Sequence, residues 1–191
     1  MTKGRMEAFS DGVLAIIITS MVLELKVPHG ADLAALEPLL PVFLSYVLSF
    51  VYVAIYWNNH HHLLQATQRV NGPIMWANVH LLFWLSLFPF ATAWMGENHF
   101  ATLPVAIYGG VLLCAALAYT ILVRTLIAHH EPGSTLATAI GADRKGQLSL
   151  LLYVVGIGLS FVAWWLGAAL YVAVALVWLV PDTRIERTLR A

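Results

Sequence analysis

The sequence predicts an all-α integral membrane protein, with residues 1–191 forming a single domain of six transmembrane helices. The prediction rests on the composition, on a series of long apolar segments and on the distribution of Lys and Arg between them. Hydrophobic residues make up 60% of the chain and charged residues 10%, whereas soluble domains are about 45–50% apolar and about 25% charged. So few charged residues cannot cover a surface that faces water, and we therefore expect most of the chain to lie in the bilayer.

Six apolar segments account for the expected helices, because a helix needs about 20 mostly apolar residues to cross a bilayer. They cover residues 6–26, 39–64, 73–95, 102–127, 147–165 and 168–181. The breaks between the first five are polar or contain Pro and Gly, and they fall at residues 28–32, 69–73, 96–99 and 129–145. The last apolar run is too long for one span, so we expect a break near Gly167.

Lys and Arg predict the orientation, because cytoplasmic loops carry an excess of both residues. With a cytoplasmic N-terminus and six spans, Lys26 alone lies outside. All other basic residues lie inside: Lys3, Arg5, Arg69, Arg124, Arg144, Lys145, Arg184, Arg187 and Arg190. This bias requires an even number of spans. We therefore expect a multi-pass protein of the cell membrane with both termini in the cytoplasm.

Composition and loop lengths also exclude several function classes. Lys plus Arg and Asp plus Glu both number 10, so there is no basic surface for nucleic acid. The single cysteine, Cys114, can form no disulfide within the chain. No loop is long enough for a soluble catalytic module, and no nucleophile–base pair is evident, so we do not expect an enzyme.

Three consecutive histidines, residues 60–62, suggest a metal site at first sight. On a helix, however, successive side chains project about 100° apart, so all three cannot bind one ion. We therefore expect no metal site and no cofactor, and we assign no role to His61 or His62.

Polar residues inside the apolar segments are the main functional candidates, because they are costly in a membrane and face protein or water. Asp11, His60 and Asn78 fall at a similar depth on three consecutive predicted helices. Trp57 is three residues from His60 and shares its helix face. Such a group would form a buried hydrogen-bonded cluster that fixes helix packing. Alternatively, Ser10 caps the apolar part of the first helix and Asp11 is stabilised by its dipole.

A second pattern on the first segment is a helical stripe, with Ser20 lying beside it. The stripe consists of Gly12, Ile16, Thr19 and Leu23. Small and hydroxyl residues commonly allow membrane helices to approach each other closely. The same pattern would also suit a pore wall, in which apolar rings form a constriction and hydroxyl oxygens face a cation. Periodicity alone does not separate the two interpretations, and packing is the commoner one.

The run that starts at Arg5 and continues through Phe9-Ser10-Asp11 and Ala15-Ile16 to Thr19 resembles the signature of the transmembrane protein 175 family of potassium channels. Later landmarks follow in the same order: Trp57, His60, Asn78 and Leu87-Phe88-Pro89. The lysosomal member of that family has two such repeats per chain, and prokaryotic members have one. Length and predicted span number match a single-repeat member.

The resemblance implies a homotetramer in which the first helices line a central pore for potassium and other monovalent cations. It places a narrow hydrophobic constriction at Ile16, a further apolar ring at Leu23 and a selectivity layer at Thr19. It also implies that the Phe-Ser-Asp motif packs against the Trp, His and Asn of neighbouring helices. Ser20 departs from relatives with a bulky apolar residue there. The Thr-Val-Gly-Tyr-Gly filter is absent from the sequence, so we expect modest selectivity for potassium over sodium.

A secondary transporter of a small solute or ion is the alternative. Many transporters are built from internal repeats. Residues 1–95 and 96–191 show no convincing repeat, and the second half has no counterpart of Asp11. No helix is rich in Arg, so we expect no steep voltage gating.

Overall fold

Helices account for all the regular secondary structure in the computed structural model, which describes residues 2–67, 69–129 and 143–179. Within these ranges there is no strand, so the all-α prediction is confirmed. The elements are α1 (Lys3–Leu23), the 3-10 helix η1 (Leu33–Leu39), α2 (Leu40–Gln65), α3 (Gly72–Leu85), α4 (Phe88–Glu97), α5 (Thr102–Ala128), α7 (Arg144–Ser160) and α8 (Trp164–Leu179).

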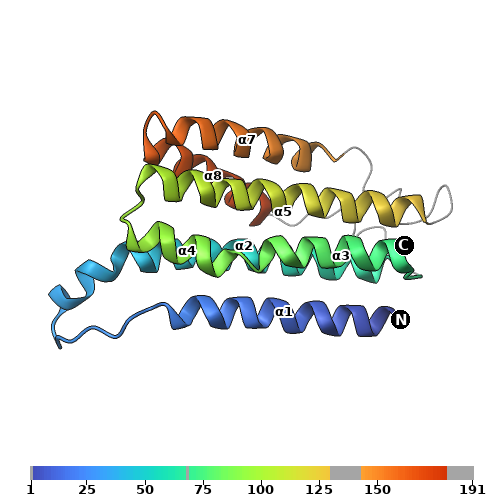
Figure 1. The fold of residues 1–191 in the computed structure, drawn as a ribbon, viewed down its shortest axis with the longest axis horizontal. Helices are drawn as coiled ribbons and strands as arrows, with labels where there is room; N and C mark the ends of the chain where they lie inside the picture. The colour runs from blue at the N-terminus through green and yellow to red at the C-terminus, as the bar shows by residue number, and fades with distance from the viewer. Residues whose placement is uncertain (1, 68, 130–142, 180–191) are drawn as a thin grey trace.

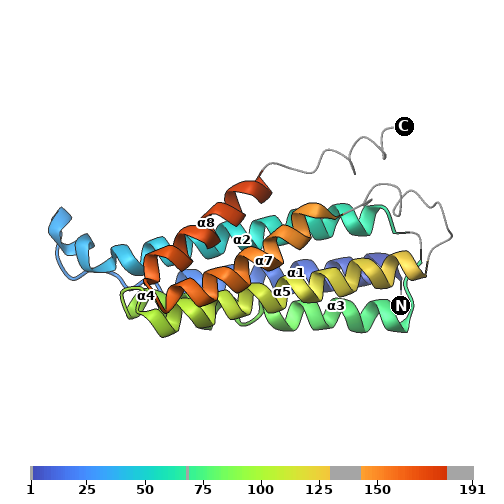
Figure 2. The same ribbon diagram turned by 90° about the horizontal axis from the view of Figure 1, so that it is seen from above.

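The helices run side by side along the long axis of the molecule (Figure 1). Helix α1 lies at one edge and α7 at the opposite edge, with α2, α3, α4 and α5 between them. Helix α1 packs against α2, α3 and α4, whereas α5 packs against α3, α4, α7 and α8. Figure 2 shows α8 inclined across the bundle. Among the described residues, one long face of α1 therefore has no neighbouring helix.

The third predicted segment is not one continuous helix. Helix α3 ends at Leu85 and α4 begins at Phe88, with Pro89 in the first turn of α4. Proline has no backbone N–H and its ring clashes with the preceding turn, so it begins a helix readily but interrupts one. The two helices together still cover one span of 26 residues, Gly72–Glu97.

The break in the last apolar run lies at residues 161–163, before the predicted position near Gly167. Gly167 belongs to α8 and is buried against α7. A Cβ added there would lie 2.7 Å from the carbonyl oxygen of Gly156 and would also meet the hydroxyl of Ser160. The glycine thus permits the close approach of two helices and does not mark the turn between them.

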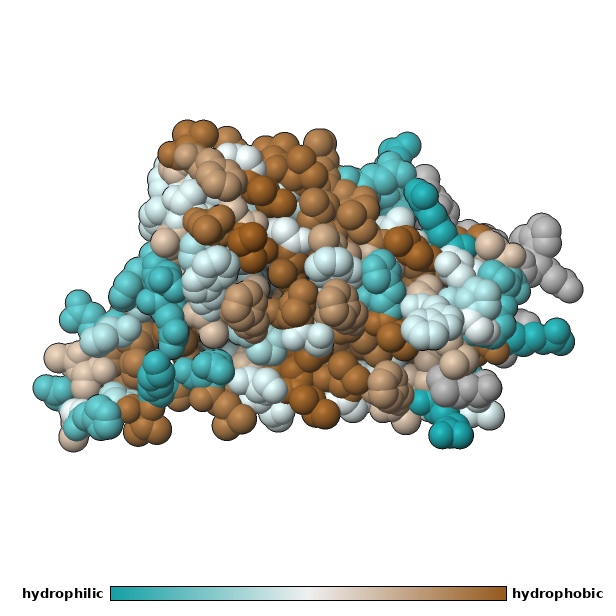
Figure 3. Space-filling model, viewed as in Figure 1, coloured by the Kyte–Doolittle hydropathy of each residue, from teal (hydrophilic) through white to brown (hydrophobic). Residues whose placement is uncertain are grey.

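Apolar side chains cover the middle of the molecule, and hydrophilic ones gather at its two ends (Figure 3). Four described segments are long and apolar enough to cross a membrane: Lys3–Leu23, Leu33–Gln65, Gly72–Glu97 and Thr102–Ala128. Helices α7 and α8 have 17 and 16 described residues, fewer than the about 20 that a span usually needs. The number of six spans therefore stays a prediction.

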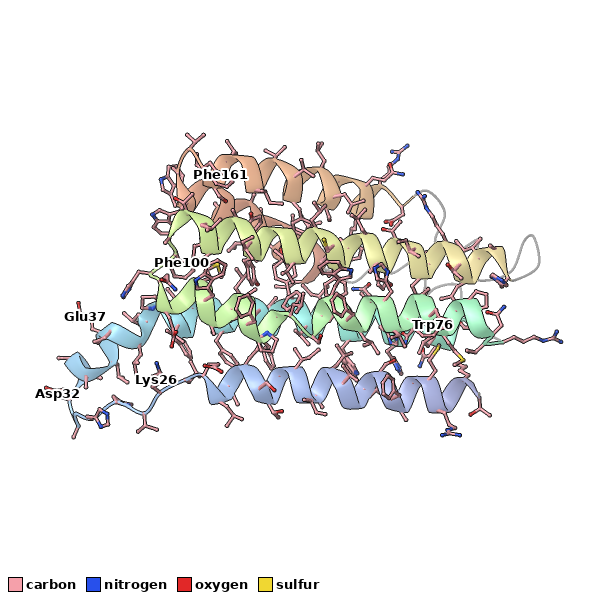
Figure 4. The ribbon with its side chains drawn as sticks, in the orientation of Figure 1. Lys26, Asp32, Glu37, Trp76, Phe100 and Phe161 are labelled. Atoms are coloured by element: carbon pink, nitrogen blue, oxygen red, sulfur yellow. The ribbon has the colours of Figure 1, made fainter. Side chains whose placement is uncertain are left out.

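Basic residues are distributed unequally between the two ends of the bundle. Lys26 lies at one end with Asp32 and Glu37 (Figure 4). The other described basic residues lie on segments at the end where α1 and α7 begin: Lys3, Arg5, Arg69, Arg124, Arg144 and Lys145. Arg184, Arg187 and Arg190 lie outside the described residues, as does most of the predicted 129–145 loop. The cytoplasmic placement of both termini stays a prediction.

Lys26, in the segment that follows α1, forms an ion pair with Glu97 at the end of α4. Its Nζ lies 2.8 Å from Oε1 of Glu97. The hydrogen bond and the opposite charge of Glu97 raise the pKa of Lys26 above its ordinary value. Both side chains are well exposed, so this ion pair contributes little to stability.

Candidate functional site

Helix α1 has one buried face. Met6, Ser10, Leu14, Ile17 and Met21 are the buried residues of this helix, and they recur every three or four positions. This spacing places them on one side of a helix. Because that side meets α2, α3 and α4, it fixes the rotation of α1 about its axis.

The opposite face of α1 carries the predicted stripe and is open. Ile16 is 65% exposed and Leu23 is 81% exposed, and Gly12 and Thr19 are also exposed. A Cβ added at Gly12 would contact no other atom within 4 Å. A contiguous apolar face of this kind marks an interface or a lipid-facing surface.

Thr19 interrupts the apolar stripe with an oriented hydroxyl group. Its Oγ1 donates to the carbonyl oxygen of Ile16 at 3.0 Å. Because the hydroxyl hydrogen points back into the helix, the oxygen lone pairs remain available to accept or to face a cation. Ser20 is only half-exposed and lies beside the stripe.

A chain of buried hydrogen bonds links three helices behind this open face. Asn78 Nδ2 on α3 donates to Ser10 Oγ on α1 at 2.9 Å. Asn78 Oδ1 lies 2.7 Å from His60 Nε2 on α2, an arrangement that requires the Nε2-protonated tautomer. Ser10 Oγ donates in turn to the carbonyl oxygen of Met6 at 2.8 Å. Ser10, His60 and Asn78 are exposed by no more than 2%.

Asp11 belongs to a second, more exposed contact between α1 and α2. Trp57 Nε1 donates to Asp11 Oδ1 at 3.1 Å. The predicted group of Asp11, His60 and Asn78 is thus divided in the structure, with Ser10 in place of Asp11 in the buried chain. Within the Phe-Ser-Asp motif, Ser10 bonds to α3 and Asp11 bonds to α2. These two hydrogen bonds join α1 to its neighbours at one depth.

Glu7 and His61, to which the sequence assigned no role, extend this second contact. The ring of His61 stacks on Trp57 with centroids 6.0 Å apart, and His61 Nδ1 lies 3.3 Å from Glu7 Oε1. Glu7 lies four residues before Asp11, and His61 lies four residues after Trp57. Because residues four apart share a helix face, this spacing could have indicated that both belong to the contact.

Arg5 and Phe9 take no part in these hydrogen bonds, and both are exposed, Phe9 by 56%. Within the Phe-Ser-Asp motif, Ser10 contacts Asn78 and Asp11 contacts Trp57. A packing role for Phe9 stays a prediction. Among the described residues, no group of three His, Cys, Asp or Glu could hold a metal ion.

Long apolar helices, buried polar links between them and an open apolar helix face define a multi-pass helical membrane protein. Residues 5–89 match the family described as "Endosomal/lysosomal potassium channel TMEM175". A potassium channel of Chryseobacterium sp. (strain P1-3) is 57% identical over 190 residues, which cover 100% of this chain and 99% of the relative. The chain belongs to the TMEM175 family, as its first-helix motif predicted.

Two further relatives agree over most of the chain. A potassium channel of Streptomyces collinus is 34% identical over 172 residues, covering 84% of each chain. The crystal structure of a lysosomal potassium-selective channel TMEM175 homolog from Chamaesiphon minutus superposes with a TM-score of 0.82 at 29% identity, covering 94% of this chain and 97% of that one. The family is one of channels, so the prediction that the chain is not an enzyme is confirmed.

Proposed function

We propose that the chain is one subunit of a potassium-permeable channel in which α1 helices from a homotetramer line the pore. The observation that carries the proposal is the open face of α1, where Ile16, Thr19 and Leu23 lie exposed in one row. Names of the relatives, which describe potassium channels, support the same function.

Residue chemistry on α1 favours copies of the chain over lipid as its neighbours. Lipid would suit a uniformly apolar face, but this one carries Gly12 and the outward-facing oxygen of Thr19. Four such faces around an axis would cover the apolar side chains and direct the Thr19 oxygens into a shared path. The contacts of Ser10 and Asp11 with α2 and α3 would hold each α1 in register.

Ion passage then follows from the order of rings along α1. Ile16 side chains from the four subunits form a hydrophobic constriction that excludes water when closed. A cation loses part of its hydration shell at this constriction. The hydroxyl oxygens of the Thr19 layer, one turn away, compensate for the lost water ligands. Ser20 adds hydroxyls beside that layer, and Leu23 forms a second apolar ring. Oxygens of side chains alone, without a carbonyl filter, give modest selectivity for potassium over sodium.

The proposed topology has six spans in one domain over residues 1–191, with both termini cytoplasmic. Helices α3 and α4 form one span, and the shorter α7 and α8 complete the set. Partners are the other subunits, the bilayer and monovalent cations. Potassium is the permeant ion, and conduction needs no cofactor.

Potassium flux from purified protein in liposomes tests the function. Vesicles are loaded with potassium and diluted into sodium, and efflux is followed against empty vesicles. Fast, passive, potassium-favouring efflux without a second solute is the expected result. Slow, saturable exchange that requires a counter-substrate would instead establish the secondary transporter, and α1 would then serve packing.

Replacing Thr19 by Ala is expected to lower the permeability ratio of potassium to sodium about threefold, because an interaction of about 0.6 kcal/mol changes a rate ratio by that factor. The ratio is measured from reversal potentials in planar bilayers with the two ions on opposite sides. Thr125→Ala is the matched control, since Thr125 also donates to a carbonyl within its own helix but lies on α5. An unchanged ratio in the Thr19 variant would remove the selectivity role.

A further inference from the structure

A small cavity lies inside the subunit, between α2, α5, α7 and α8 and away from α1. Its volume is about 40 Å³. Since one water needs about 10–15 Å³ of cavity volume, the cavity has room for about three waters or three non-hydrogen atoms of a ligand. The proposed pore face of α1 contributes no residue to its wall, so the channel function does not explain it.

Aromatic rings form much of the cavity wall. Tyr56, Tyr119, Tyr153 and Trp178 line it, and the rings of Tyr56 and Tyr119 meet edge to face with centroids 6.1 Å apart. Aromatic faces carry negative charge density and attract cations. The chain itself shows this preference, because Nζ of Lys145 lies 5.9 Å from the centroid of the Trp178 ring.

Asp143 places a carboxylate in the same wall. Its Oδ1 accepts from the backbone N–H of Gly146 at 2.9 Å, which caps α7. A carboxylate oxygen has more than one lone pair, and the second oxygen adds further acceptors. The cap therefore fixes the position of Asp143 and uses only part of its capacity to accept hydrogen bonds.

Two neutral groups add to the polar side of the cavity. Asn59 donates its amide Nδ2 to the carbonyl oxygen of Ile55 at 2.8 Å, which leaves its side-chain oxygen as an acceptor. Tyr56 is 9% exposed and lines the cavity, and its hydroxyl makes none of the hydrogen bonds seen among the described residues. Its oxygen can therefore accept a hydrogen bond from a water or a ligand.

We propose that this cavity binds a small primary ammonium group, such as that of ethanolamine. An ammonium has three N–H donors, and the wall offers it three acceptors: the Asp143 carboxylate, the Asn59 side-chain oxygen and the Tyr56 hydroxyl oxygen. The nitrogen and the two carbons of ethanolamine are the three non-hydrogen atoms for which the cavity has room, with the aromatic rings around the carbons and the ethanolamine oxygen outside. An anion is excluded by the carboxylate and by the ring faces. A quaternary ammonium exceeds the available volume and has no N–H to donate.

Two sources supply this chemistry: a free alkylamine and the headgroup of an aminolipid. The cavity wall includes the start of α7 and the end of α8, which are joined by the hydrogen bond from Trp178 Nε1 to Ser149 Oγ at 2.8 Å. Helix ends lie near the bilayer surface in a multi-pass protein, and tryptophan is enriched there. A lipid headgroup and a soluble amine both have access to that depth.

Saturation-transfer NMR with ethanolamine, on purified protein in detergent and sodium buffer, measures binding of the free amine. Native mass spectrometry after reconstitution with phosphatidylethanolamine or phosphatidylcholine measures retention of the lipid. Asp143→Asn keeps an oxygen to cap α7 but loses the charge. Glu97→Gln is the matched control, because it removes a carboxylate at the opposite end of the bundle. Ala116→Leu fills the cavity from α5, and melting temperatures verify the fold of each variant.

Saturable binding of ethanolamine, or selective retention of phosphatidylethanolamine, is expected for the wild type and for Glu97→Gln. Asp143→Asn is expected to raise the dissociation constant about tenfold, and Ala116→Leu is expected to abolish binding. Whichever probe binds identifies the source. Absence of both, or equal binding by the Asp143 and Ala116 variants, would overturn the proposal. Neither measurement depends on ion flux, so the result is independent of the channel function.

Discussion

Ile16→Asn is expected to raise potassium efflux from liposomes about tenfold. An apolar ring opposes wetting of the proposed constriction, and an amide side chain of similar size would hold water there. A barrier lowered by about 1.4 kcal/mol gives a tenfold faster rate. Because Ile16 is 65% exposed and is not one of the buried residues of α1, we expect the substitution to leave the packing of α1 intact.

Ile121→Asn is the control for this experiment. Ile121 is 46% exposed on α5, so the same change in chemistry occurs on an outer surface away from α1. Efflux is measured at equal amounts of reconstituted protein, and the control is expected to match the wild type. Unchanged efflux in the Ile16 variant would remove this residue from the constriction. A rise in both variants would indicate a general leak of the bilayer.

The sequence predicted the depth of the polar contacts between α1 and its neighbours to within about one helical turn. Depth in the bilayer follows from span direction, and this argument brought His60 and Asn78 together correctly. It did not distinguish Ser10 from Asp11, since adjacent residues have nearly equal depth but point about 100° apart. Only the packing of α1 on α2 and α3 decides that Ser10 faces inward and Asp11 meets Trp57.

Breaks between helices were predicted less well, because Pro and Gly each serve more than one purpose. Pro89 gave a sufficient local signal for the start of α4, yet the segment around it is apolar enough to resemble one helix. Gly167 suggested a turn but serves close packing of α8 on α7. The aromatic cavity had no sequence signal at all, since Tyr56, Tyr119 and Trp178 are brought together only by tertiary structure.

Asn78→Ala is expected to destabilise the subunit by about 2 kcal/mol. The asparagine side chain bonds Ser10 and His60, both almost fully buried, so its removal leaves two polar groups without these partners. A buried group that loses its partner costs about 1–3 kcal/mol, although hydrogen bonds in membrane proteins average less. For a chain of this length the melting temperature should fall by about 4–8 °C, as measured by thermal unfolding in detergent.

Asn58→Ala is the matched control. Asn58 is half-buried on α2, and its side chain makes none of the hydrogen bonds seen among the described residues. The melting temperature of this variant should stay within about 1 °C of the wild type.

Ser10→Ala, alone and combined with Asn78→Ala, then tests whether the two residues act as a unit. If they do, the double variant loses less than the sum of the single losses. Strict additivity would mean that Asn78 stabilises the fold by packing, and the buried polar chain would then not be what holds α1 against α2 and α3.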